Sequence, residues 1–244
     1  MKVPPRRRRR PGTVRANQPG DVLRCLLLAR GTEWVAVDVA SGTLVRNRAS
    51  GWPAPAGASH GDATSADSPG LAGAEVPPEL DIVELELAGD DEPPDPARPE
   101  AVMLRQAPAR VGTPRRRAVR RILQELLPAD PRRPLLGSLG PSISYENLDG
   151  SRPSVAVVAP DRAPVFATDA KGTWCHFALG GRKHQLPVLD ERIVEAKASS
   201  RGAALGSDAV ARAIGGPPRY LVIGLGVPRR GQAPKLVFGV LPRP

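Results

Sequence analysis

Proline and glycine divide this chain into short segments, and this division limits the folds open to it. They account for 29 and 25 of the 244 residues, just under the share at which a whole chain resembles low-complexity sequence. No uninterrupted apolar run approaches the roughly 18 residues that cross a bilayer. Short β-branched and apolar runs bounded by glycine-containing turns are typical of consecutive strands. We therefore expect an α+β fold with a mainly antiparallel sheet and two short helices.

Changes in composition divide the chain into five parts. Residues 1–20 carry prolines and basic residues with almost nothing to bury, which predicts a disordered basic arm. Residues 21–48 contain three apolar runs and form a β-rich segment of the main domain. Residues 49–79 are rich in Ala, Ser, Gly and Pro, which predicts a disordered linker or insertion. An acidic strand and loop over 80–104 then lead into an α+β body over 105–244.

Two segments have the pattern of amphipathic helices. In the first, Thr113 is a suitable N-cap, Pro114 suits the first helical position and Pro128 ends the apolar periodicity. The second extends from Ser207, the expected cap, to Ile214, before a Gly-Gly-Pro-Pro run. Apolar residues recur at spacings of three and four in the first helix, and arginines crowd its N-terminal half.

The charge distribution predicts a binding function. Residues 1–50 carry 11 basic and 3 acidic residues, whereas residues 51–100 carry 1 basic and 12 acidic residues. Arginines in the arm and in the first helix could neutralise nucleic-acid phosphates, giving salt-sensitive affinity with little sequence preference. The candidate polyanion-binding residues are Arg6, Arg7, Arg8, Arg9, Arg10, Arg115, Arg116, Arg117, Arg120 and Arg121.

Several alternatives to nucleic acid are open. The same surface could bind an acidic protein, with the chain acting as a scaffold that has no nucleic-acid role. Ten acidic residues between 75 and 100 could instead cover the arginines. Arginine, which GC-rich codons specify, also far outnumbers lysine, so its abundance could reflect genome composition. The pattern leaves oligomeric state open.

One hairpin brings a thiol and an imidazole onto the same face of a sheet. If Gly180 and Gly181 form a two-residue turn, side chains on the two strands pair in a fixed register. That register pairs Leu179 with Arg182, Phe177 with His184, and Cys175 with Leu186. Cys175 and His184 are then diagonal neighbours, which allows a cysteine-dependent enzyme as a less favoured alternative. Packing of Cys175 in the core is the interpretation we prefer.

Motifs for other chemistry are absent from the sequence. The segment at Gly224 and Gly226 lacks the third glycine of a dinucleotide-binding loop, and Pro228 interrupts the helix that should follow. Three histidines and two cysteines are too few, and too dispersed, to favour a metal site. We therefore expect a binding module without enzymatic activity, cofactor or metal. Reduced cysteines and the lack of an export signal predict a cytoplasmic protein.

Overall fold

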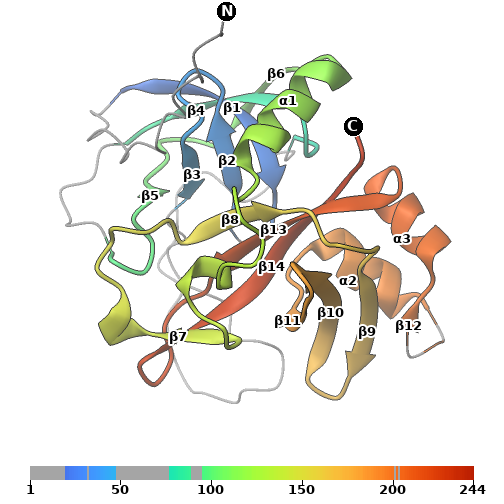
Figure 1. Ribbon diagram of the computed structural model, residues 1–244. Coiled ribbons are helices and arrows are strands. Elements are labelled where there is room, and N and C mark those ends of the chain that lie inside the picture. Colours follow the sequence, from blue (N-terminus) through green and yellow to red (C-terminus); the bar gives the residue numbers. More distant parts are fainter. Residues whose placement is uncertain (1–19, 32, 48–76, 89–94, 201, 203) are drawn as a thin grey trace, which may run out of the picture.

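The computed structural model describes residues 20–31, 33–47, 77–88, 95–200, 202 and 204–244. These residues form mostly antiparallel sheets with three α-helices, which confirms the expected α+β class (Figure 1). The predicted arm and insertion lie almost entirely outside the described residues. None of the described helices has the length and apolar character needed to cross a membrane.

The first sheet is built from the N-terminal β-rich segment and the acidic strand. Its strands are β1 (Val22–Ala29), β2 (Val35–Asp38), β3 (Leu44–Asn47), β4 (Ile82–Glu86), β5 (Ala101–Val102) and β6 (Ala109–Gly112). They are ordered β5-β3-β2-β1-β4-β6, and only the short β3–β5 pair is parallel among the pairings of this sheet. Gly42 closes the β2–β3 hairpin with φ +73°, the left-handed conformation expected of this turn.

Two four-stranded sheets contain the remaining strands. The second sheet has the order β7-β14-β13-β8, with β7 (Ser142–Ser144), β8 (Val155–Val158), β13 (Pro218–Leu225) and β14 (Gln232–Pro242). The third has the order β11-β10-β9-β12, with β9 (Val165–Asp169), β10 (Gly172–Leu179), β11 (Arg182–Pro187) and β12 (Ala204–Leu205). A parallel bridge between Val188 and Val237 links the third sheet to the second.

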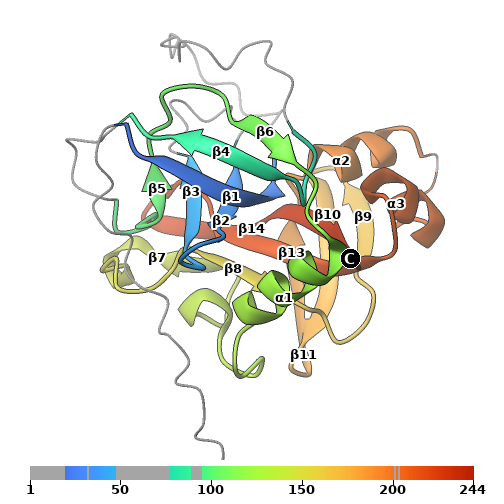
Figure 2. The same cartoon turned by 90° about the horizontal axis from the view of Figure 1, so that it is seen from above.

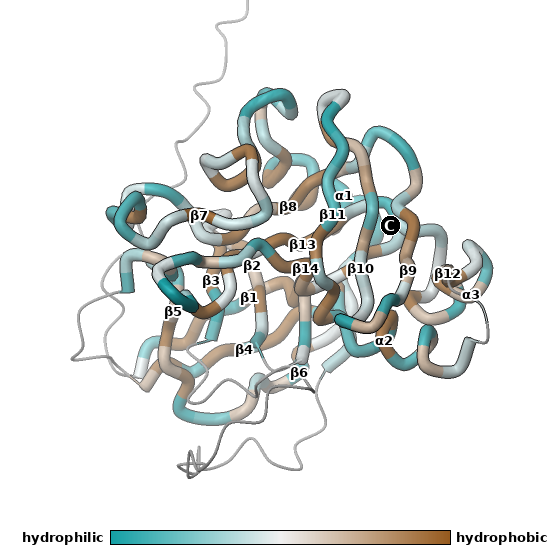
Figure 3. The backbone as a smooth tube through the Cα atoms, turned by 90° about the horizontal axis from the view of Figure 1, so that it is seen from below, coloured by the Kyte–Doolittle hydropathy of each residue, from teal (hydrophilic) through white to brown (hydrophobic). Residues whose placement is uncertain are grey.

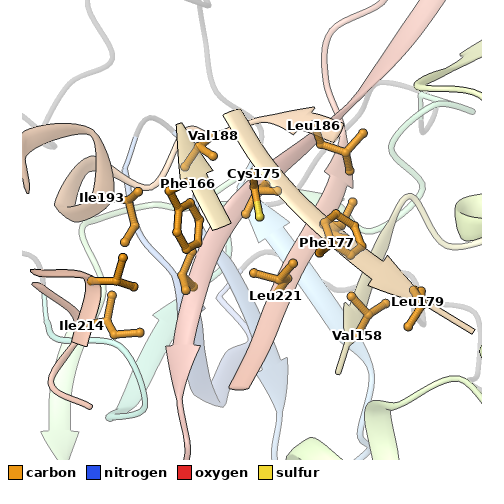
Figure 4. Packing of buried hydrophobic residues seen from close by; sticks show 14 of the residues in the cluster. Val158, Phe166, Cys175, Phe177, Leu179, Leu186, Val188, Ile193, Ile214 and Leu221 are labelled. Carbon is orange, nitrogen blue, oxygen red and sulfur yellow. The ribbon is translucent and has the colours of Figure 1, made fainter. Parts of the chain in front are cut away.

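The second sheet lies between two apolar layers, which explains the nearly continuous hydrophobicity of β13 and β14. Leu221 and Ile223 pack on the side of the third sheet, in the cluster that contains Phe166 and Cys175 (Figure 4). Residues that alternate with them, such as Val222, pack with β1, β2 and α1 instead. Successive side chains of a strand point to opposite faces, so a strand buried on both faces needs apolar residues at every position. Hydrophobic segments accordingly lie at the centre and hydrophilic loops at the periphery (Figure 3).

The helices differ from the sequence predictions in two respects. The first helix, α1, spans Arg116–Leu126 with Arg115 as N-cap, so it begins later than predicted. Thr113 does not cap it, because its hydroxyl donates instead to the Asp81 carboxylate at 2.6 Å. The predicted second helix is confirmed as α3, Ser207–Ile214, although Gly206 is its N-cap.

A third helix, α2 (Glu191–Ala198), was not predicted. The Asp190 side chain caps it by accepting a hydrogen bond from the backbone N–H of Arg192. Ile193 is fully buried and packs in the same cluster as α3.

Candidate polyanion-binding surface

Helix α1 buries one side and exposes its arginines on the other. Val119 and Leu123 are buried in the cluster formed with β1, β8, β13 and β14. A spacing of four residues keeps both on one face of the helix, and Ile122 packs against the same cluster. The five predicted arginines of this region are all exposed. They form what we call the arginine face: Arg115, Arg116, Arg117, Arg120 and Arg121.

The arginine face has no acidic side-chain partner among the described residues. The first turn of α1 contains no acidic residue, and the ion pairs of the described residues include none of the five arginines. Arg120 donates to the backbone oxygen of Pro244 at 3.1 Å. Arginines four apart on a helix repel each other, and cations near its N-terminus oppose the dipole. A bound anion would relieve both of these unfavourable interactions.

A second group of cations lies on the segment that follows α1 and on the β10–β11 hairpin that contacts it. A Cβ atom added at Gly180, in the β10–β11 turn, would lie 2.5 Å from the Pro131 carbonyl oxygen, so the turn lies directly against this segment. The exposed cations of the two segments are Arg132, Arg133, Arg182 and Lys183. Helix α1 and the hairpin lie along the same edge of the molecule (Figure 2). Sequence reasoning missed this group because the two segments meet only in the folded chain.

The acidic residues of segment 75–100 do not cover the arginine face where the structure describes them. Each described acid from Glu79 to Asp95 forms an ion pair with an arginine outside that face, and Glu100 is buried elsewhere. These pairs are Glu79–Arg192, Asp81–Arg110, Glu84–Arg24, Glu86–Arg105 and Asp95–Arg98, with N–O distances from 2.5 to 3.0 Å. The remaining four acids, Glu75, Asp90, Asp91 and Glu92, lie outside the described residues, as do Arg6 to Arg10.

The thiol and imidazole of the alternative hypothesis lie in the predicted hairpin. All three predicted residue pairs are present in the β10–β11 register, which confirms that part of the analysis. Cys175 is fully buried, and burial raises the pKa of its thiol. The His184 ring stacks on Phe177 with centroids 5.0 Å apart. Burial, followed by the charges of Lys235 and Arg182, lowers the pKa of His184. Burial and a raised pKa favour a packing role for this thiol.

A buried charge cluster joins the first and second sheets, and the sequence analysis did not identify it. Arg46 in β3 forms an ion pair with Glu33, and both side chains are fully buried. Arg46 also donates to the Ser154 hydroxyl and to the Leu225 carbonyl, both at 3.0 Å. Glu100 accepts from the Ser154 hydroxyl at 2.7 Å and from the backbone N–H groups of Ser154 and Val155. Each contact holds chain segments in place, so we assign the cluster a structural role.

The described part of the chain offers no candidate metal site. No group of three or more His, Cys, Asp or Glu side chains among these residues could hold a metal ion. No family model, curated protein or solved structure matches the sequence or the fold. Inference about function therefore depends on the chemistry of this chain alone.

Proposed function

We propose that the protein is a polyanion-binding module that contacts nucleic acid through the arginine face of α1. The observation that carries this proposal is the exposure of five arginines on one short helix and its N-cap, none paired with a described acidic side chain. Guanidinium groups bind phosphate in a bidentate manner, and phosphate contacts account for most non-specific affinity. The cations at Arg132, Arg133, Arg182 and Lys183 extend the same edge and would lengthen the phosphate footprint.

Nucleic acid fits this surface better than an acidic protein does. Energetically dominant positions in protein interfaces are enriched in aromatic side chains as well as arginine. Neither α1 nor the following segment 127–134 contains an aromatic residue, and none of the large exposed apolar residues of the described chain belongs to α1. Base stacking on aromatic rings is also missing from this face, which favours contact with duplex phosphates over a single strand. An acidic protein partner remains the second candidate, because it would use the same charges.

A salt titration of oligonucleotide binding tests this proposal. We expect the full chain to bind a short duplex, with log affinity falling by about 0.9 per phosphate contact for each tenfold increase in salt. Changing Arg116, Arg117, Arg120 and Arg121 to Gln should weaken binding at low salt and reduce that slope by roughly 3 to 4.

A control variant with the same net charge separates a defined surface from general attraction. Lys171, Arg212, Arg229 and Arg230 are exposed cations outside the arginine face, and all four are changed to Gln. The control should retain nearly the wild-type salt slope. Equal losses in the two variants would show that only net charge matters, and no binding by wild type at low salt would refute the nucleic-acid proposal. Binding of an acidic peptide but not of duplex would favour the second candidate.

A further inference from the structure

A cavity of about 420 Å³ opens beside β7, away from the residues of the arginine face. It lies between the segment 136–153 and Leu225 at the end of β13. Ligand pockets in proteins have volumes of roughly 300 to 1,000 Å³. The cavity is therefore large enough for a small organic molecule.

Buried polar contacts hold two walls of this cavity in place. Lys235 is fully buried, and its ammonium donates to the carbonyl oxygens of Ser138 and Gly140 at 2.6 and 2.7 Å. On another wall, Ser154 is held by Arg46 and Glu100 of the buried charge cluster. A binding site formed before the ligand arrives avoids part of the entropic cost of ordering it.

The interior of the cavity is apolar on one side. Ile143 and Leu225 belong to a small buried cluster, and Leu136 and Leu148 pack against it. All four residues line the cavity. This side would accept the hydrocarbon part of a ligand.

Polar side chains with unused donors also line the cavity. Arg152 lines the cavity, is exposed, and makes no hydrogen bond or ion pair with a described residue. Its Nη1 atom lies 2.7 Å from where a Cβ atom at Gly137 would be, so the guanidinium lies close to the Gly137 backbone. The side chains of Ser144 and Asn147 also line the cavity without hydrogen bonds to described residues.

Asp149 is the one carboxylate among the lining residues, and it is already engaged. Its Oδ1 atom accepts hydrogen bonds from the backbone N–H and the hydroxyl of Ser151, which lower its pKa. The positive charge of Arg152 acts in the same direction. Arg152, Ser144 and Asn147 nevertheless offer more free hydrogen-bond donors than the one carboxylate oxygen of Asp149, Oδ2, can accept from.

We propose that this cavity binds a small organic anion, with its apolar body against Ile143 and Leu225 and its acidic group on Arg152. The acidic group is a carboxylate, sulfonate or phosphate, because each offers oxygen acceptors to a guanidinium. This site is separate from the nucleic-acid surface, since the two share no residue.

Fluorescence titration with anilinonaphthalene sulfonate tests the site, because this probe combines aromatic rings with one sulfonate. The folded full chain should bind one probe molecule, and Arg152→Gln should weaken binding roughly tenfold through loss of a charged hydrogen bond. Asn147→Phe places a ring at an exposed lining position and should also weaken binding. Arg229→Gln is the matched control and should leave the affinity unchanged.

Amide chemical-shift mapping with the same probe locates the site. Perturbations confined to residues 136–154 and the end of β13 would support the proposal. No binding by wild type, or equal affinity in Arg152→Gln and wild type, would overturn it. The variant that lacks Arg116, Arg117, Arg120 and Arg121 distinguishes the two surfaces, since it should lose duplex binding and keep probe binding. Loss of probe binding in that variant would place the probe on the arginine face and overturn the proposal.

Discussion

The guanidinium of Arg46 in β3 donates to the hydroxyl of Ser154, the residue that precedes β8, at 3.0 Å. This contact joins two sheets through residues 108 positions apart in the chain. The same guanidinium contacts the carboxylate of Glu33 and lies over the Phe238 ring, 5.2 Å from its centroid. Neither Arg46 Nε nor Glu33 Oε1 has a hydrogen-bond partner in the described structure. Hydrogen bonds therefore compensate only in part for the removal of this pair from water.

Removing Arg46 should therefore destabilise the protein strongly. Arg46→Met would leave the Glu33 carboxylate buried beside only Arg98, whose Nη1 is 3.9 Å away. We expect the free energy of unfolding to fall by about 3–5 kcal/mol, as for other buried pairs that lose one partner. Urea denaturation measures this change, and adding Glu33→Gln to Arg46→Met should restore part of the loss.

Arg24→Met is the matched control for this prediction. Arg24 forms an ion pair with Glu84, but 61% and 40% of the two side chains are exposed. Exposed pairs contribute about 0 to 1 kcal/mol, so the control should change stability little. Similar effects of the two substitutions would show that the Arg46 cluster does not stabilise the junction between the sheets.

Local patterns in the sequence predicted the local structure well. The Gly180–Gly181 turn fixed the β10–β11 register because two glycines of positive φ form a two-residue connection. The acidic strand expected within residues 80–104 is likewise present as β4, with Val83 and Leu85 buried on one face. The exposure of the α1 arginines followed from apolar residues at spacings of three and four.

Features that depend on distant contacts were beyond sequence reasoning. Thr113 is a suitable N-cap residue by its type, but its hydroxyl donates to Asp81, which approaches it only in the folded chain. Arg46 in β3 and Lys235 in β14 are buried, whereas a charged side chain in a strand is ordinarily exposed to water. Their burial requires partners contributed by other segments, such as Ser154 for Arg46 and the Ser138 carbonyl for Lys235. The cavity beside β7 depends on the same long-range contacts.

Contact between the β10–β11 turn and the segment after α1 predicts different effects of alanine at two adjacent glycines. Gly180 has φ +57°, and a Cβ atom there would also clash with the backbone of Pro131 and Arg132. Gly181 has φ +82°, with no atom within 4 Å of an added Cβ. Gly181→Ala should cost about 1–2 kcal/mol through its left-handed conformation alone. Gly180→Ala should cost about 1–3 kcal/mol more, because it adds the steric clash.

Thermal or urea unfolding of the two alanine variants measures this difference. Equal destabilisation would mean that the turn does not rest against Pro131 in solution. The cations at Arg182 and Lys183 would then be less firmly placed beside α1.

Burial of Lys235 predicts a specific dependence of stability on pH. Desolvation lowers the pKa of this lysine from its ordinary 10.5 to about 8 in the folded protein. Between these two values the unfolded chain binds more protons than the folded chain, so raising the pH favours folding. The stability of wild type relative to Lys235→Met should therefore increase from about pH 8 to pH 10.5, by up to about 3 kcal/mol.

Urea denaturation of wild type and Lys235→Met across this pH range tests the prediction. The comparison cancels the groups common to both proteins, including Cys175, whose raised pKa acts in the opposite direction above pH 9. Burial and the charge of Lys235 lower the pKa of His184 below its ordinary value, so this imidazole is neutral throughout the range. Parallel stability curves for the two proteins would show that the Lys235 ammonium keeps an ordinary pKa.

The last prediction concerns the reactivity of Cys175, which decides between a packing role and a cysteine-dependent enzyme. Its side chain points into the core among Phe166, Phe177 and Leu221 (Figure 4), and burial raises the pKa of the thiol. Iodoacetamide at neutral pH should therefore modify Cys175 far more slowly in the folded protein than in urea, where the thiolate is accessible. Peptide mass spectrometry distinguishes it from Cys25, which is also fully buried and whose pKa burial raises to about 12. His184→Ala should leave the rate at Cys175 essentially unchanged if the imidazole does not activate the thiol. Rapid modification of the folded protein that His184→Ala abolishes would instead establish an activated pair and favour the enzyme hypothesis.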